Sequence, residues 1–237
     1  LRLYGTVYSV TPTGKAIPYR TSFDQKATPV LPAEKVIEHI LTDLHEADSL
    51  LEISDPKNFD LPEYYSKDYN AFEDSRQLRM NTCAVKAMLA RVYCYKGDAE
   101  SKRKALTYAY DVVESNYFAL YEDNSNPVLF AEHIFGLNVY ELDKLLEDEG
   151  NYKTRIPEGQ LSDGVYIMRT KANFDEHFET GSRGTFDIRA NTSAFKNVAG
   201  NGSKEYKLCL KYDQSSYTSN ASKYYGKDVL PLIRLPE

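Results

Sequence analysis

The chain has 237 residues, a formal net charge of −6 and 42% hydrophobic residues. This is the composition of an ordinary globular protein, which excludes a disordered chain, collagen and a small disulfide scaffold. The acidic balance argues against sequence-independent binding of nucleic acid, and no apolar run reaches the roughly 18 residues of a membrane-spanning helix. The unusual feature is aromatic, because the chain has 20 Tyr, 10 Phe and no Trp.

The first element with a clear pattern is a helix that begins near Glu34, after residues 1–31, which predict loop with short extended pieces. Pro32 suits the first helical turn, and Asp55-Pro56 lies beyond the end of the helix. Apolar residues recur every three or four positions along it, as expected for one buried stripe. The stripe consists of Val36, Ile37, Ile40, Leu41, Leu44, Ala47, Leu50 and Leu51. The opposite, polar face is expected to carry Glu38, Asp43, Glu46 and Asp48.

A polar, tyrosine-rich insertion at 55–79 separates this helix from two more. Asn81 is the expected N-cap of a helix that is apolar almost all round, so other elements should pack on several of its sides. Lys96-Gly97-Asp98 ends that helix, with Gly at the left-handed position. A third helix is expected over about Ser101–Ser115. The two helices, with small alanines at their contact, resemble a tetratricopeptide-type helical hairpin.

The sequence becomes irregular after residue 116. Short strands are expected at Phe118–Tyr121, His133–Tyr140 and Val165–Thr170, short helices at Tyr140–Glu149 and Asn173–Glu179, and loops at Asn151–Gln160 and Ala190–Ser203. The predicted fold is therefore mainly α, with tetratricopeptide-like helical hairpins packed against an irregular, loop-rich region with short strands. The helical half covers about 32–116, and the irregular half covers about 117–237.

Catalytic and metal-binding patterns are missing from the sequence. It has no glycine-rich phosphate loop, nucleophile elbow or zinc-type cysteine pair. Glu147-Asp148-Glu149 is interpreted as a solvated helix end, and Glu176-His177-x-Glu179 has no second His at a ligand spacing. We therefore predict no catalytic residue, no metal and no cofactor, although a calcium ion held by loop oxygens cannot be placed from sequence. The odd number of cysteines argues against a disulfide framework, and Cys83 and Cys94 are expected to be buried.

Several segments resemble one known family when their order and spacing are considered together. The strongest runs from Arg79 to Tyr93 and leads into Lys96-Gly97-Asp98. A second stretch combines residues 14–19 and 27–32 with 43–47 of the first long helix. The remaining segments are Glu132-His133-Ile134-Phe135-Gly136, Asp187-Ile188-Arg189 and Pro231-Leu232-Ile233-Arg234-Leu235-Pro236-Glu237. Over essentially the whole chain, the sequence resembles the SusD/RagB family of surface-exposed, nutrient-binding outer-membrane lipoproteins of Bacteroidota.

The resemblance implies one SusD-like domain over 1–237, and it suggests the interior of a longer protein. In the family, helices and a lipid-bearing cysteine precede the first matching segment, and further helices follow the last. The resemblance implies non-catalytic glycan binding at the surface of the outer membrane and delivery to a TonB-dependent, SusC-like transporter. Membrane association is expected only through a lipid anchor outside this chain. Two alternatives stay open: capture of peptides or other nutrients on the same scaffold, and a helical-repeat adaptor or an unrecognised hydrolase.

Tyrosine suits a glycan site, because sugar C–H faces stack on aromatic rings and the hydroxyl bonds to sugar hydroxyls. Loops carry binding sites more often than regular elements do. The candidate ligand-binding residues are Tyr140, Tyr152 and Tyr166 in the irregular half, and Tyr64, Tyr65 and Tyr69 in the insertion. The helical tyrosines 93, 95, 108 and 110 are interpreted as structural. The family's best-described platforms use Trp, so here the site would be rebuilt from Tyr, lie outside this chain or serve another ligand.

Overall fold

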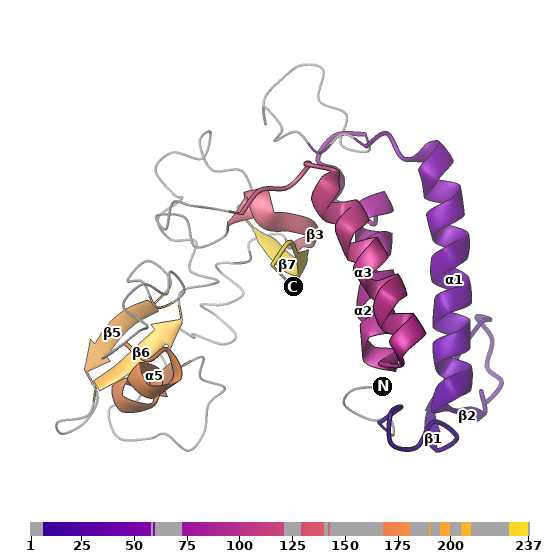
Figure 1. Cartoon of the computed structure of the whole chain (residues 1–237), viewed down its shortest axis with the longest axis horizontal. Helices are drawn as coiled ribbons and strands as arrows, with labels where there is room; N and C mark the ends of the chain where they lie inside the picture. Colours follow the sequence, from indigo (N-terminus) through magenta and orange to yellow (C-terminus); the bar gives the residue numbers. More distant parts are fainter. Residues whose placement is uncertain are drawn as a thin grey trace. The chain divides into compact units, whose positions relative to one another are not determined.

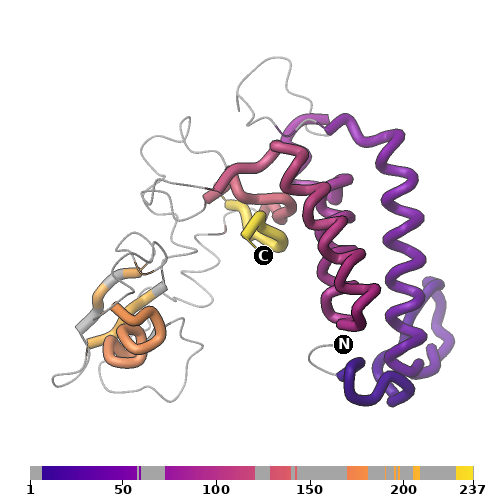
Figure 2. The backbone as a smooth tube through the Cα atoms, viewed as in Figure 1, coloured from indigo at the N-terminus to yellow at the C-terminus, as the bar shows by residue number. Residues whose placement is uncertain are grey.

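The computed structural model describes residues 7–57, 59, 73–120, 129–139, 142, 168–180, 190, 195–199, 205–209 and 228–236. The chain divides into two compact units. Figures 1 and 2 colour the chain by residue number. The helical unit consists of Leu1–Asp60 and Asn70–Phe118, and the second unit of Leu61–Tyr69 and Ala119–Glu237. The assignment of the chain to one SusD-like domain stays a prediction.

Three long helices form the helical unit. Its elements are β1 (Lys15–Pro18), β2 (Val30–Pro32), α1 (Ala33–Ser54), the 3₁₀ turn η1 (Arg76–Leu78), α2 (Thr82–Lys96) and α3 (Ala99–Glu114). β1 and β2 pair antiparallel just before α1 begins, and α2 and α3 form a hairpin that lies beside α1 (Figure 1). Val85, Leu89 and Tyr93 of α2 form a buried cluster against α1 and α3. The prediction of a mainly helical fold with a tetratricopeptide-type hairpin is confirmed.

Local capping explains where α2 and α3 begin and end. The Asn81 side chain accepts a hydrogen bond of 2.8 Å from the backbone N–H of Ala84, which confirms it as the N-cap of α2. Gly97 ends α2 with φ of 82°, a left-handed conformation that glycine adopts without steric cost. Asp98 then caps α3 by accepting from the N–H of Ser101 at 2.9 Å. Because of this cap, α3 begins earlier than the predicted Ser101.

The second unit contains short strands and one short helix. Its described elements are η2 (Phe130–Glu132), β3 (His133–Asn138), β4 (Met168–Thr170), α5 (Lys171–His177), β5 (Phe195–Ala199), β6 (Glu205–Cys209) and β7 (Val229–Arg234). β3 pairs antiparallel with β7, and a separate three-stranded sheet has the order β4-β6-β5. α5 buries Phe174 against Phe178 and Phe195, with ring centroids 4.6 and 4.8 Å apart.

Two predictions for the irregular half are wrong where the structure describes the chain. Residues 118–120 form no strand, because Phe118 is buried against Phe59 and a single backbone bond joins Ala119 to Ala131. The predicted loop Ala190–Ser203 contains β5, which pairs along its whole length with β6. The sequence of β5 has no clear alternation, so this strand depends on its partner. The predicted helix Tyr140–Glu149, apart from Leu142, and the predicted loop Asn151–Gln160 lie outside the described residues.

The two cysteines of α2 differ in environment. Cys83 is buried as predicted, and burial raises the pKa of its thiol to about 11. Cys94 is exposed, which corrects the prediction that both are buried. The two side chains lie about three helical turns apart on nearly the same face. The difference therefore comes from the ends of the hairpin, because Cys83 lies beside Ser115 and Asp55 whereas Cys94 occupies the last turn of α2.

Candidate functional site

All the tyrosines predicted to bind ligand lie outside the described residues. They are Tyr64, Tyr65, Tyr69, Tyr140, Tyr152 and Tyr166. Their roles therefore stay predictions. Among the described residues, no group of three or more His, Cys, Asp and Glu is placed to hold a metal ion, and no described helix is long and apolar enough to cross a membrane.

A histidine joins the three long helices. His45 of α1 lies 2.8 Å through Nε2 from the hydroxyl of Tyr93 on α2, and its Nδ1 lies 3.5 Å from the hydroxyl of Tyr108 on α3. The two tyrosine rings are nearly parallel, with an interplanar angle of 4° and centroids 6.0 Å apart. Lys104 lies 5.6 Å from the Tyr93 ring centroid. Tyr93 and Tyr108 thus pack the helices together, in agreement with their structural interpretation.

Asp48 lies close to this histidine and is less solvated than the sequence predicts. It was expected on the polar face of α1, but the structure places it toward α2 and α3, near Lys86 and Asp111. Its Oδ1 atom is buried without a hydrogen-bond partner. Burial is the main influence that raises the pKa of Asp48 above its ordinary value, and Lys86 opposes the rise.

We expect Asp48→Asn to stabilise the helical unit at pH 7 by about 0.5 kcal/mol, the scale of single charge optimisations. Because folding raises the pKa of this acid, its ionised form opposes folding at neutral pH and its protonated form does not. The advantage of the variant should therefore shrink as the pH falls through the pKa of Asp48. Urea unfolding followed by circular dichroism at neutral and acidic pH measures it, with Glu46→Gln as the exposed control on α1. A less stable Asp48→Asn protein at pH 7 would show that attraction to Lys86 dominates.

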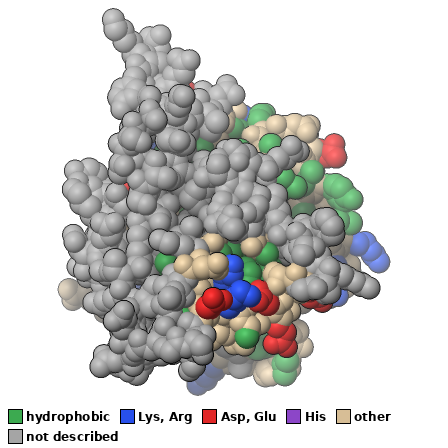
Figure 3. Space-filling view, turned by 90° about the vertical axis from the view of Figure 1, so that its left-hand side faces the viewer, with side chains coloured by type: hydrophobic (Ala, Val, Ile, Leu, Met, Phe, Trp, Pro, Cys, Tyr) green, Lys and Arg blue, Asp and Glu red, His purple; other side chains and the backbone are tan. Residues whose placement is uncertain are grey.

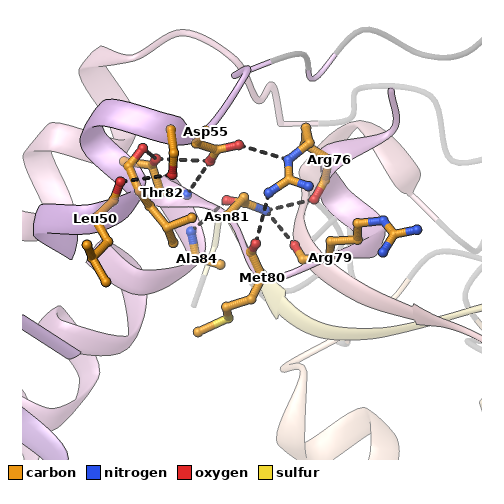
Figure 4. Close-up of polar contacts among 10 residues, drawn as sticks. Leu50, Asp55, Arg76, Arg79, Met80, Asn81, Thr82 and Ala84 are labelled. Atoms are coloured by element: carbon orange, nitrogen blue, oxygen red, sulfur yellow. Dashed lines mark hydrogen bonds and ion pairs between the residues drawn. The ribbon is translucent and has the colours of Figure 1, made fainter. Parts of the chain in front are cut away.

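A buried cluster around Asp55 connects the end of α1 to η1 and to the start of α2 (Figure 4). The Nε atom of Arg76 donates to Oδ1 of Asp55 at 2.8 Å, and the side chains of the two residues are 5% and 0% exposed. The backbone N–H and the hydroxyl of Thr82 donate to Oδ2 at 2.7 and 2.9 Å. Burial alone would raise the pKa of Asp55, but these hydrogen bonds and the Arg76 charge hold it below its usual value. Both oxygens are occupied, so this cluster holds the fold together.

Among the described residues of the second unit, one ion pair lies within α5 and another joins β7 to η2. On the face that Figure 3 presents, acidic and basic side chains of described residues lie next to one another. Lys171 lies 2.6 Å from Asp175 one turn along α5, an exposed type of pair that contributes little to stability. Arg234 of β7 lies 2.7 Å from Glu132, whose carbonyl also accepts from the N–H of Leu235 at 2.8 Å. The two contacts of Glu132, with Arg234 and with Leu235, hold β7 beside β3.

A surface pair of rings lies where β1 meets α1. The rings of Tyr19 and His39 are stacked, with centroids 5.0 Å apart and planes inclined by 17°. The Tyr19 hydroxyl donates a hydrogen bond to Oδ2 of Asp43. Asp43 follows His39 by one helical turn, so both project from the same side of α1. The sequence placed Asp43 on the polar face, but no local pattern joined it to Tyr19.

The Asp43 hydrogen bond, with a smaller effect of burial, raises the pKa of Tyr19 to about 12. At about pH 10.5, where an ordinary tyrosine is mostly ionised, we expect wild type and Tyr19→Phe to have equal phenolate absorbance. In the Asp43→Asn background, Tyr19→Phe should remove the signal of one phenolate. Ultraviolet absorbance of the four proteins measures both differences. A wild-type protein with one phenolate more than Tyr19→Phe at this pH would contradict the assignment.

The comparisons with known proteins show a fold likeness. No family model matches the chain, and no curated protein matches it significantly. Among solved structures, the chain is similar to a SusD-like carbohydrate binding protein from Bacteroides vulgatus, with a TM-score of 0.56 and 16% sequence identity. The match covers 98% of this chain and 44% of that protein, so the chain spans less than half the length of its structural neighbour. At this identity the likeness shows the fold alone.

Proposed function

We propose that this protein belongs to the SusD/RagB lipoproteins of Bacteroidota and binds glycans at the surface of the outer membrane without catalysis. The observation that carries the proposal is the match of 98% of the chain to a SusD-like carbohydrate binding protein. The order of the family-like sequence segments supports it independently. The tyrosines chosen from the sequence would supply flat rings and hydroxyls suited to sugar recognition.

Affinity electrophoresis in gels that contain different polysaccharides, followed by calorimetry on any that retard the protein, tests the proposal. We expect at least one neutral polysaccharide to bind, and Tyr152→Ala or Tyr166→Ala to weaken that binding. Tyr110→Ala is the matched control, because Tyr110 is an exposed tyrosine on α3, outside the proposed site. If a glycan binds and both loop variants behave as wild type, the proposed tyrosines are wrong. If only peptides bind, the scaffold captures peptides instead.

The proposal includes delivery of the glycan to a TonB-dependent, SusC-like transporter and attachment of the protein to the cell surface through a lipid anchor. Cells that lack the natural protein should fail to import the glycan that it binds, and the full-length gene should restore import. If the deletion strain imports the glycan at an unchanged rate, the protein takes no part in its transport.

A protein-interaction adaptor is the second candidate, and the outer face of α3 favours it. Leu106, Tyr110 and Val113 recur at helical spacing and are 57, 57 and 52% exposed. Ala109, on the same helix, is exposed as well. An adaptor would lose partner binding in Leu106→Glu, whereas a glycan-binding protein would keep its polysaccharide affinity in that variant.

A further inference from the structure

The end of the helical unit where β1 meets α1 has a geometry that suits a ligand. Tyr19 and His39 form a stacked pair at the surface, where His39 is exposed and Tyr19 is half-buried. Asp43, also exposed, accepts the Tyr19 hydroxyl through Oδ2. Among the described residues, Tyr19 is the one hydrogen-bond partner of this carboxylate. The second oxygen of Asp43 is therefore available to a ligand beside the rings.

From this arrangement we propose that Tyr19, His39 and Asp43 form a subsite for a neutral sugar ring. The inference rests on the proposed glycan-binding function, and it places a subsite apart from the loop tyrosines. A pyranose presents an apolar C–H face, which packs on the exposed imidazole, and hydroxyls around its rim. The carboxylate of Asp43 accepts such hydroxyls in short, charge-assisted hydrogen bonds.

The three side chains are held in place before any ligand arrives. His39 and Asp43 are fixed one turn apart on a 22-residue helix. Tyr19 directly follows β1, whose partner β2 leads straight into that helix. The Tyr19 hydroxyl is committed as a donor to Asp43, and its oxygen keeps acceptor capacity for a sugar hydroxyl. Little side-chain ordering is then needed when a sugar binds, which favours affinity.

The surrounding charge selects against acidic sugars. Glu46 lies exposed about one turn beyond Asp43, and Glu38 lies exposed on the same helix, where it pairs with Lys35 at 2.7 Å. Two basic residues lie nearby in the sequence, Arg20 and Lys35, and they pair with Asp24 at 3.3 Å and with Glu38 at 2.7 Å. A uronic acid would bring a further carboxylate next to Asp43, and like charges at short distance repel. A neutral sugar avoids this repulsion.

Histidine side-chain NMR tests the subsite, because the chain has 4 His and His39→Gln identifies the signal of His39. At constant pH, we expect methyl β-D-glucopyranoside or methyl β-D-galactopyranoside to shift the His39 signal in a saturable way. Asp43→Ala should weaken that binding about tenfold, the effect of losing hydrogen bonds to a charged group. Methyl β-D-glucuronide, which adds a carboxylate, should bind at least tenfold more weakly than the glucoside. Glu52→Ala, roughly 20 Å from His39 and about 14 Å from Asp43 along α1, should bind as wild type.

Three results would overturn the subsite: a silent His39 signal with both neutral glycosides, unchanged affinity in Asp43→Ala, or equal affinity for the glucuronide. Affinity electrophoresis of the same protein in polysaccharide gels separates this proposal from the general glycan-binding function. If polysaccharides bind while the His39 signal is silent, the subsite is wrong and the glycan-binding function stands. If the glycosides shift the His39 signal while no polysaccharide retards the protein, the subsite stands and the proposed function fails.

Discussion

Replacing Asp55 by alanine should lower the free energy of unfolding of the helical unit by about 3–5 kcal/mol, the usual cost of removing one partner from a buried ion pair. The variant removes the carboxylate that accepts from Nε of Arg76 and from the N–H and hydroxyl of Thr82, all of which are buried beside it. Because folding lowers the pKa of Asp55, its contribution is present above the unfolded pKa and is lost as the pH falls. The cost of Asp55→Ala should therefore decrease toward acidic pH.

Urea unfolding followed at the helical circular dichroism band measures this cost. Glu100→Ala is the control, because it removes an acid from an exposed pair with Lys104 and should cost at most about 0.5 kcal/mol. The double variant Asp55→Leu with Arg76→Met should recover much of the lost stability, since it replaces both charges of the buried pair by apolar side chains. A loss below about 1 kcal/mol in Asp55→Ala would mean that water reaches Arg76 and replaces the carboxylate.

A single methyl group at Gly136 should destabilise the β3–β7 pair by about 1–3 kcal/mol, as expected for overpacking of a filled site. A Cβ atom at this position would lie 2.7 Å from Cγ1 of Val229 and 3.2 Å from the carbonyl oxygen of Leu230. The Val229 side chain has few allowed χ1 rotamers, and the backbone at Leu230 resists displacement. The two strands must therefore separate locally. Gly136→Ala should therefore increase amide hydrogen exchange in both β3 and β7.

Hydrogen exchange measured on peptides that cover the two strands tests this effect. Val229→Ala removes the nearest clashing atom, so the double variant with Gly136→Ala should exchange more slowly than Gly136→Ala alone. Leu137→Ala is the control, because Leu137 is exposed and lies next to Gly136 in the same strand. Equal protection in wild type and Gly136→Ala would show that the strands have room for a side chain.

The helical unit was predictable because its signals are local. The cap at Asn81 and the stop at Gly97 are set by neighbours within one turn, and the apolar period of α1 spans the whole helix. Local pattern predicted environments less well, since Asp48 and Cys94 follow the helical period but their burial depends on what covers each end of the bundle. The pair β5–β6 and the stack of Tyr19 on His39 join segments that no periodicity connects.

The predicted ligand tyrosines could be chosen by composition and by resemblance, but their arrangement could not. A tyrosine in a loop becomes a sugar platform only when its ring faces a second group at the right spacing. Neither the spacing nor the facing group is encoded within a few positions of Tyr152 or Tyr166. Tyr19 illustrates the same difficulty, because its partners His39 and Asp43 belong to another element.

The ion pair between Asp55 and Arg76 also closes a connection, since these residues are 21 positions apart in the chain. Tyr64, Tyr65 and Tyr69 belong to this connection. The entropic cost of closing a flexible connection grows only with the logarithm of its length, by about 0.6 kcal/mol for each doubling. With the two ends joined by this ion pair, we expect insertions and new side chains between Asp55 and Arg76 to cost the helices little stability. If Tyr64, Tyr65 and Tyr69 bind ligand as predicted, ligand specificity can change while α1, α2 and α3 keep their sequence.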